Sequence, residues 1–173
     1  GSLPSLPISL NTVLLDNTGI ENLDGLSGCK NITKLSAFNN SINSISGLNA
    51  TTSVIEDLNL GYNNVTDGDF SNFVNVKKLN VSDNELTSFK SPNTNELSFV
   101  GNPFTDSDPD LGLIDGDIKL NLKESNPPKG KVQKTTMSSE QKLNTLKSLS
   151  TNSTLNVELI TSDMPLPDEY WWE

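Results

Sequence analysis

The sequence predicts an α/β solenoid, a right-handed coil with a parallel sheet on its concave face and a non-repeat C-terminal cap. The first observation is an apolar pattern that occurs four times in full and once in truncated form within residues 8–104. The second is the position that closes each copy, which holds Thr18, Asn40, Asn63, Asn84 and Asn102. These positions are 22, 23, 21 and 18 residues apart, and a period of about 20 to 29 residues is typical of one class of solenoid repeat.

The third copy illustrates the pattern, as Ile55-x-x-Leu58-x-Leu60-x-x-Asn63-x-Val65. Side chains alternate along a strand, so Leu58 and Leu60 point inward and the residues beside them point outward. One copy cannot bury its apolar face alone, and stacked copies form a continuous core beneath a parallel sheet. Each closing asparagine is expected to bond the backbone of neighbouring copies, which makes these residues a structural ladder. Thr18 can do so only in part, as expected of a terminal copy.

The pattern L-x-x-L-x-L-x-x-N-x-L resembles the leucine-rich repeat. The first two copies also carry an apolar residue at every third position, in the runs Ile20, Leu23, Leu26, Cys29, Ile32 and Ile42, Ile45, Leu48. This spacing resembles the 22-residue subclass found in bacterial internalins and in a phosphatase-regulator family. The resemblance covers roughly residues 8–104, and it implies a fold that binds other molecules rather than one that catalyses a reaction.

Two parts of the chain are expected to differ in organisation. Residues 3–104 form the predicted solenoid of about five repeats, in which residues 3–9 cover one open end of the core. The solenoid is expected to end near Phe104, because Pro103 stops further strand continuation. Residues 105–173 do not repeat. We expect them to pack on the last repeat as a cap or a small appended subdomain, since an uncovered end would expose apolar core.

Local patterns predict several further elements. Phe70 and Phe73 are expected to anchor a short helical turn on the convex side. Beyond the repeats, strands are predicted over 117–123 and 155–159, with a loop over 125–136. A short amphipathic helix is predicted to begin at Ser138 or Ser139 and to carry Leu143, Leu146 and Leu149.

Composition argues against several classes of function. The chain has 173 residues and a net charge of −10 at pH 7, and its 12 basic residues are all lysines. An acidic chain is repelled by nucleic acid and by anionic membrane surfaces. It has no histidine, which is the commonest general base and metal ligand. The sequence therefore predicts no enzyme, no cofactor and no nucleic-acid partner.

Cysteine and glycosylation signals say little about location. Cys29 is the single cysteine, so an intrachain disulfide is excluded, and its apolar position predicts a buried hydrophobe. Sequons for N-glycosylation occur at Asn31, Asn39, Asn49, Asn64, Asn80 and Asn152, and chance alone gives about 5 of them in a chain so rich in Asn, Ser and Thr. No apolar run approaches the ~18–20 residues that span a bilayer, so this fragment is not expected to insert into a membrane.

The acidic run from Asp106 to Asp117 partly matches a calcium-binding loop. Aspartates stand at the first, third and fifth positions, but Leu111 stands where the loop requires glycine, and Asp117 stands where it requires glutamate. A solvated acidic turn without metal is therefore favoured.

Two further motifs also have plain explanations. The lysines Lys129, Lys131 and Lys134 are expected to lie in a solvated loop rather than to form a phosphate site. The aromatic run Tyr170-Trp171-Trp172 is expected to cover the end of the solenoid, and a docking tail for a partner is the alternative.

Candidate partner-binding residues come from the outward positions of the strands and from the turns that follow them. They are Lys34, Phe38, Asp57, Asn59, Tyr62, Lys78, Asn80 and Glu96. The four charged residues among them form a column that alternates in sign, beside an aromatic pair. Charge pairing between neighbouring strands explains the column without a ligand. A patterned polar surface with an aromatic anchor, suited to a protein or peptide, explains it equally well.

The sequence thus predicts a non-catalytic protein- or peptide-binding module. The leading interpretation is the glycoprotein ectodomain of a larger membrane receptor, located at the cell surface. The alternative is a cytoplasmic scaffold or regulatory-subunit-like leucine-rich-repeat protein, favoured by the 22-residue subclass and the single cysteine. A hydrolase within residues 105–173 is disfavoured by the small size of that segment and the missing histidine. Neither the ligand nor the oligomeric state is predicted.

Overall fold

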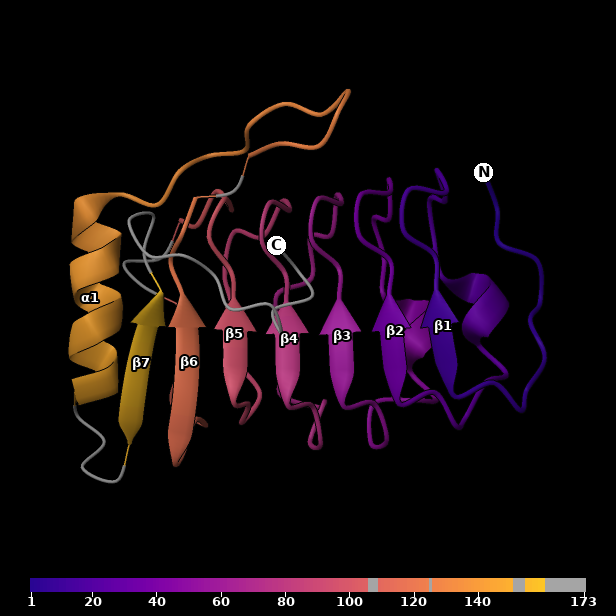
Figure 1. Cartoon of the computed structure of the whole chain (residues 1–173), viewed down its shortest axis with the longest axis horizontal. Helices are drawn as coiled ribbons and strands as arrows, with labels where there is room; N and C mark the ends of the chain where they lie inside the picture. The colour runs from indigo at the N-terminus through magenta and orange to yellow at the C-terminus, as the bar shows by residue number, and fades with distance from the viewer. Residues whose placement is uncertain (106–108, 125, 151–154, 161–173) are drawn as a thin grey trace.

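The computed structural model describes residues 1–105, 109–124, 126–150 and 155–160. These residues form one all-parallel sheet of seven strands, which lie side by side in chain order (Figure 1). The strands are β1 (Thr12–Leu14), β2 (Lys34–Ser36), β3 (Asp57–Asn59), β4 (Lys78–Asn80), β5 (Glu96–Ser98), β6 (Asp117–Asn121) and β7 (Asn156–Ile160). The helices are η1 (Asp24–Leu26) and η2 (Ser46–Leu48), both short 3₁₀ helices, and α1 (Ser139–Ser150). The arrangement is compatible with the α/β class, although its helix content is low.

A line of leucines attaches the central strands to the core. Leu35, Leu58, Leu79, Leu97 and Leu120 are neighbours in register on β2 to β6, and all are fully buried. Because side chains alternate along a strand, the residues on either side of each leucine point to the opposite face. Burial of each leucine contributes roughly 1.5–3 kcal/mol. The line therefore sets both the register of the strands and the face that points outward.

Buried asparagines lie where the chain leaves the strands, and Asn63 is representative. Its Oδ1 accepts a hydrogen bond from the Ile42 N–H at 3.0 Å, and its Nδ2 donates to the carbonyls of Ala37 at 2.9 Å and Leu60 at 3.0 Å. Equivalent bonds join successive turns at Asn40, Asn84 and Asn102. Each amide therefore satisfies backbone groups of two successive turns, which would otherwise be buried without partners.

The residue before each position of this ladder has a left-handed backbone. The φ angles are 61° at Asn17, 56° at Asn39, 52° at Tyr62, 57° at Asp83 and 81° at Gly101. Asparagine, aspartate and glycine adopt this conformation readily. Tyr62 is the exception, because the conformation costs a bulky residue about 1–2 kcal/mol. Surrounding contacts must therefore hold Tyr62 in place.

Five phenylalanines form a continuous row through the core. Phe70 lies 5.6 Å from Phe73 and 6.0 Å from Phe89, measured between ring centroids. Phe89 stacks on Phe99 at 5.7 Å with the planes 11° apart, and Phe99 lies 6.2 Å from Phe104. The expected helical turn at Phe70 and Phe73 is instead a set of hydrogen-bonded turns. The row ties together the segments that follow β3, β4 and β5.

The sheet continues past Phe104, contrary to the expected end of the stacking there. β6 follows β5 in the same register, with Leu120 beside Leu97, and β7 pairs with β6 along its full length. Pro103 does not interrupt the sheet, because it lies beyond β5 in the following turn. The strands predicted near 117–123 and 155–159 are confirmed as β6 and β7.

α1 begins at the predicted serines and lies beside β7 at the end of the sheet (Figure 1). The Ser138 Oγ accepts from the Gln141 N–H at 3.1 Å, and the Ser138 N–H donates to the Gln141 Oε1 at 2.9 Å, which is a capping box. The predicted apolar face is only partly correct. Leu149 is buried, but Leu143 and Leu146 are 51% and 37% exposed. The helix therefore turns a narrower apolar face to the core than its leucine spacing suggested.

The N-terminal residues cover the opposite end of the core, as expected. Leu3, Leu6 and Leu10 pack against it in part-buried positions. The Leu6 N–H donates to the Gly25 carbonyl at 2.9 Å. A Cβ on Gly25 would lie 2.2 Å from a carbonyl oxygen of this N-terminal segment, so only glycine permits the close approach. Cys29 is fully buried nearby, as its place in the apolar pattern predicted.

Candidate functional site

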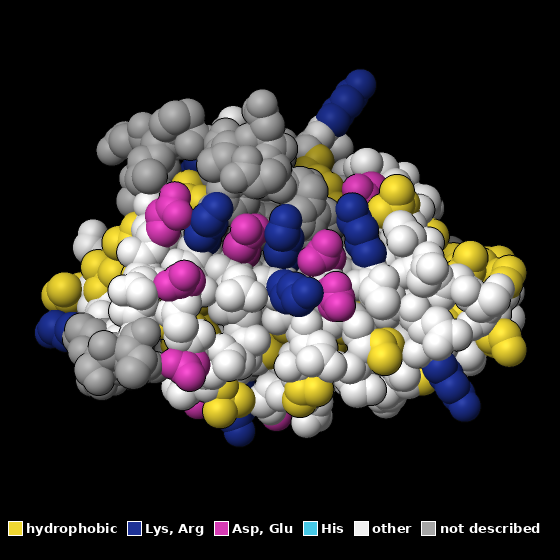
Figure 2. Space-filling model, turned by 60° about the horizontal axis from the view of Figure 1, so that its bottom comes forward, with side chains coloured by type: hydrophobic (Ala, Val, Ile, Leu, Met, Phe, Trp, Pro, Cys, Tyr) yellow, Lys and Arg dark blue, Asp and Glu magenta, His cyan; other side chains and the backbone are white. Residues whose placement is uncertain are grey.

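The first outward position of the strands carries alternating charges, which we call the charged row. It consists of Lys34, Asp57, Lys78, Glu96, Lys119 and Glu158, one residue from each of β2 to β7 in direct register. Figure 2 shows basic and acidic side chains alternating in a line across this face. The Lys78 amino group lies 3.9 Å from the Glu96 carboxylate. The sheet thus places the four predicted charged residues side by side and adds two more.

Sequence reasoning missed Lys119 and Glu158 for different reasons. A signal for Lys119 was present, because Leu120-x-Leu122 repeats the spacing of Leu97-x-Phe99 after 23 residues, which is one repeat period. No such signal marks Glu158. The residue paired with Leu120 on β7 is Leu159, which follows 39 residues later because α1 intervenes.

The second outward position is polar but buried. It holds Ser36, Asn59, Asn80, Ser98 and Asn121, none more than 5% exposed. The Asn59 Oδ1 accepts from the Gly61 N–H at 3.0 Å, and the Asn80 Oδ1 accepts from the Ser82 N–H at 2.9 Å. These amides bond the backbone at the ends of their own strands. Asn59 and Asn80 are therefore not exposed partner contacts, which corrects the expectation from the sequence.

Phe38 and Tyr62 form an aromatic pair just beyond β2 and β3. Their rings meet edge to face, with centroids 5.7 Å apart and planes at 75°. Phe38 is half-buried, whereas Tyr62 is 1% exposed. Only Phe38 can therefore offer surface to a partner, and the expected role of Tyr62 as a contact is corrected. Burial of the Tyr62 phenol, followed by the charges of Asp83 and Glu124, raises its pKa well above the ordinary value of 10.0.

Replacing Tyr62 by phenylalanine is expected to flatten the loss of stability at alkaline pH. The folded protein holds this phenol neutral, whereas the unfolded chain ionises it above about pH 10. The stability contributed by the raised pKa is thus complete below that pH and is lost as pH rises, by at most about 1.4 kcal/mol per unit. Urea unfolding between about pH 8 and pH 11 measures the slope. Lysine ionisation is common to both proteins, so identical slopes would contradict a buried neutral phenol.

Residues 126–137, which we call the basic arm, run across the ends of the strands (Figure 1). A tight turn forms its tip, where the Lys131 N–H donates to the Pro128 carbonyl at 3.0 Å and Gly130 has a φ of 83°. Met137, at the other end of the arm, is buried in the core. The arm is therefore anchored beside α1 and projects back over earlier strands.

Two lysines hold the arm against the segments that follow β2 and β4. The Lys131 Nζ donates to the Asn40 carbonyl at 2.7 Å, and the Lys134 Nζ pairs with Glu85 at 2.7 Å. Burial, with a further contribution from the charge of Lys134, lowers the pKa of Lys131. The expected solvated loop is correct for Lys129, which is exposed, but not for these two lysines. The arm brings them to residues that are distant in sequence.

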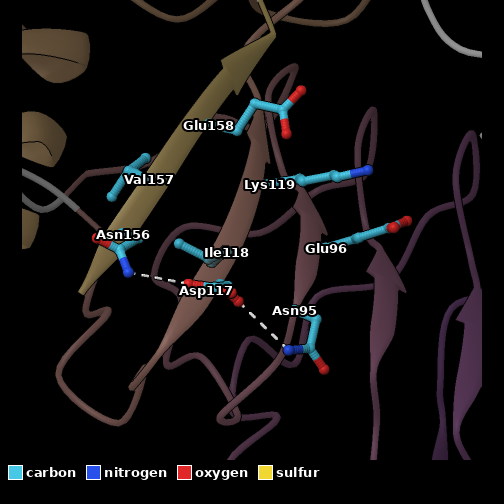
Figure 3. Close-up of a pocket in the computed structure, with 8 residues that line it drawn as sticks. All are labelled: Asn95, Glu96, Asp117, Ile118, Lys119, Asn156, Val157 and Glu158. Atoms are coloured by element: carbon cyan, nitrogen blue, oxygen red, sulfur yellow. Dashed lines mark hydrogen bonds between the residues drawn. The ribbon is translucent and has the colours of Figure 1, made fainter. Parts of the chain in front are cut away.

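The charged row ends at a hollow of about 340 Å³ at the start of β5 to β7 (Figure 3). Its walls include Glu96, Lys119 and Glu158 from the row. Across from them, the Asn156 Nδ2 donates to the Asp117 Oδ1 at 3.0 Å. Three carboxylates thus surround one lysine, so the hollow is acidic and suits a cationic group better than an anion.

Two of the remaining sequence motifs fall partly or wholly outside the residues that the structure describes. Asp106, Asp108 and Tyr170-Trp171-Trp172 lie outside the described residues. Within the described ranges, no group of three or more His, Cys, Asp or Glu side chains is placed to hold a metal ion. None of the helices in those ranges combines the length and apolar character needed to cross a membrane.

Comparison with known proteins assigns no family: no protein-family model matches the chain, and neither does any curated protein. The described residues define the class as a protein with an all-parallel sheet, in which the seven strands of those residues follow chain order. Within the described residues, its distinguishing features are the charged row on the outward face and the basic arm across the strand ends.

Proposed function

We propose that this chain is a short leucine-rich-repeat solenoid, right-handed and non-catalytic, whose outward sheet face binds a protein or peptide. The recurring leucines in register and the buried asparagines Asn63, Asn84 and Asn102 support the repeat assignment. Stacked repeats of this kind present a continuous face to a partner. The proposal therefore places the site on side chains that the strands hold in fixed register.

Two features of the outward face carry the binding proposal: the charged row, and Phe38 beyond the end of β2. Charges on a rigid sheet steer and orient a partner with complementary charges. Phe38 adds an aromatic group, the type of side chain that often dominates the energy of an interface. The acidic hollow at the end of the row extends the same surface. Together they favour a partner that brings both an apolar anchor and charged side chains.

The cellular setting has two candidates, of which we favour the ectodomain of a larger membrane receptor. A cytoplasmic scaffold or regulatory-subunit-like protein is the second. Glycosylation distinguishes the two settings, and the exposure of each sequon decides where a glycan can be attached. Asn31, Asn49 and Asn64 are exposed, whereas Asn80 is 1% exposed. Mass spectrometry of protein from the native source should find glycans at exposed sequons if the chain is extracellular. Unmodified asparagines at all three would favour the cytoplasmic alternative.

Replacing Phe38 by alanine is expected to weaken peptide binding at least tenfold, because the variant removes the aromatic anchor. A displayed random-peptide library selected on the wild-type protein supplies the probes, and calorimetric titration measures their affinity. The variant should remain folded, since Phe38 is half-buried and its ring contact with Tyr62 contributes about 0.5–1.5 kcal/mol.

Val74→Ala is the matched control. This exposed apolar residue lies on the segment between β3 and β4, away from the outward face, and its loss should leave affinity unchanged. Selected peptides that bind Phe38→Ala as tightly as wild type would contradict a site centred on this side chain.

A further inference from the structure

The signs of the charged row alternate over an even number of positions. Charge pairing between neighbouring strands of one chain does not require an even number. The six members of the row alternate from Lys34 on β2 to Glu158 on β7. An alternating row with an even number of members is complementary to its own reversal, because the sequence of signs from one end is opposite to that from the other. A row of five or seven would place like charges together.

We infer that this face forms a two-fold dimer with a second copy of the chain; the inference rests on the proposed function, because it names the protein partner of the same surface. Two-fold dimers need a self-complementary surface, and the row supplies one. An axis parallel to the strands, between β4 and β5, brings Lys34 to Glu158, Asp57 to Lys119 and Lys78 to Glu96 of the second copy. Each pair occurs twice, and every contact joins opposite charges.

The charges also disfavour the other two-fold arrangement of the two faces. A two-fold axis perpendicular to the strands would leave the order of the row unchanged. Lys34 would then face the same lysine of the second copy, and every other member would likewise face its own equivalent. The pattern therefore favours one docking orientation over the other, which is how charge arrangement gives specificity to an interface.

The scale of the row fits this role. Neighbouring strands lie about 4.8 Å apart, so the six positions span roughly 24 Å. The Lys78 side chain is 28% exposed and that of Glu96 is 12% exposed, and Glu158 at the edge is exposed. Ion pairs at a protein surface each contribute little to stability. The row thus sets the orientation and the register of the two copies.

Charge-reversal variants of the full chain test the inference. Sedimentation analysis should show a monomer–dimer equilibrium for the wild type. Asp57→Lys and Lys119→Asp each put like charges together twice in a homodimer, so each should raise the dimer Kd more than tenfold. An equimolar mixture of the two variants should dimerise again, because the Asp57 and Lys119 positions are then complementary across the interface.

Attraction between the net charges of the two variants cannot explain a dimer restored by mixing them. From the wild-type net charge of −10, Asp57→Lys gives −10 + 2 = −8 and Lys119→Asp gives −10 − 2 = −12, so both variants remain strongly acidic. Lys90→Asp, an exposed residue between β4 and β5, is the control. It makes the same charge change as Lys119→Asp outside the row and should leave the Kd nearly unchanged.

Two outcomes would overturn the dimer. One is a wild-type chain that stays monomeric at every concentration measured. The other is a mixture of the reversal variants that associates no better than either variant alone. If a reversal variant does not fold, Asp57→Asn and Lys119→Gln serve instead: each should weaken the dimer, and mixing them should restore part of the affinity, because the mixed dimer keeps one of the two Asp57–Lys119 contacts.

Discussion

Replacing Asn63 by alanine is expected to lower the free energy of unfolding by about 3–4 kcal/mol. The side chain is fully buried. It accepts from the Ile42 N–H and donates to the carbonyls of Ala37 and Leu60. Alanine cannot replace these bonds, and each buried group left without a partner costs about 1–3 kcal/mol. Urea denaturation should show the loss as a lower midpoint with an unchanged slope.

Asn64→Ala is the matched control, one residue further along the chain. Its side chain is exposed, and its backbone N–H, which bonds the Ile42 carbonyl at 2.8 Å, survives the substitution. The expected change is within about 0.5 kcal/mol. Equal losses for the two variants would show that the buried amide does not stabilise the turn as its geometry indicates.

Asn63 is buried and Asn64 is exposed because each occupies a fixed position in the repeated pattern. Such fixed positions are the reason that much of the sheet could be predicted. Within each repeat, the leucine spacing specifies which side chains point inward, and Asn63 marks where the strand ends. That information is local, so it predicted the first five strands and the outward position of Lys78. The pairing of Leu120 with Leu159 is not local, because 39 residues and a helix separate them. Sequence patterns identified β7 as a strand but not its neighbour.

The candidate site was less predictable, because exposure depends on what covers a residue. Strand position alone predicts that Asn59 points outward, yet it is 1% exposed. Tyr62 is likewise buried, and the charge of Glu124, from a segment beyond the repeats, acts on its phenol. The arm reaches Asn40 through Lys131, 91 residues away in sequence. Contacts over such distances leave no periodic signal, so the charges of the row were predictable and the accessible area beside them was not.

Replacing Phe99 by alanine is expected to have the largest effect, a loss of about 3–5 kcal/mol in the free energy of unfolding. Phe99 is fully buried. It lies between Phe89, on which it stacks, and Phe104 at the end of the phenylalanine row. Its removal takes away the buried ring area and leaves a cavity lined by aromatic side chains, which cannot collapse to fill it. Thermal and urea unfolding measure the loss directly.

Two further variants test whether the stability lost in Phe99→Ala comes from a phenylalanine row that packs as one unit. Phe99→Leu keeps most of the volume and should cost less, about 1–2 kcal/mol, so it remains measurable if the alanine variant does not fold. Phe104→Ala removes a half-buried ring at the end of the row and should cost less than Phe99→Ala. If the row is one packed unit, Phe99→Leu should also speed hydrogen exchange around Phe70 and Phe89. Faster exchange confined to the turn after β5 would instead mean that each segment packs independently, and that the rings do not join the repeats to one another.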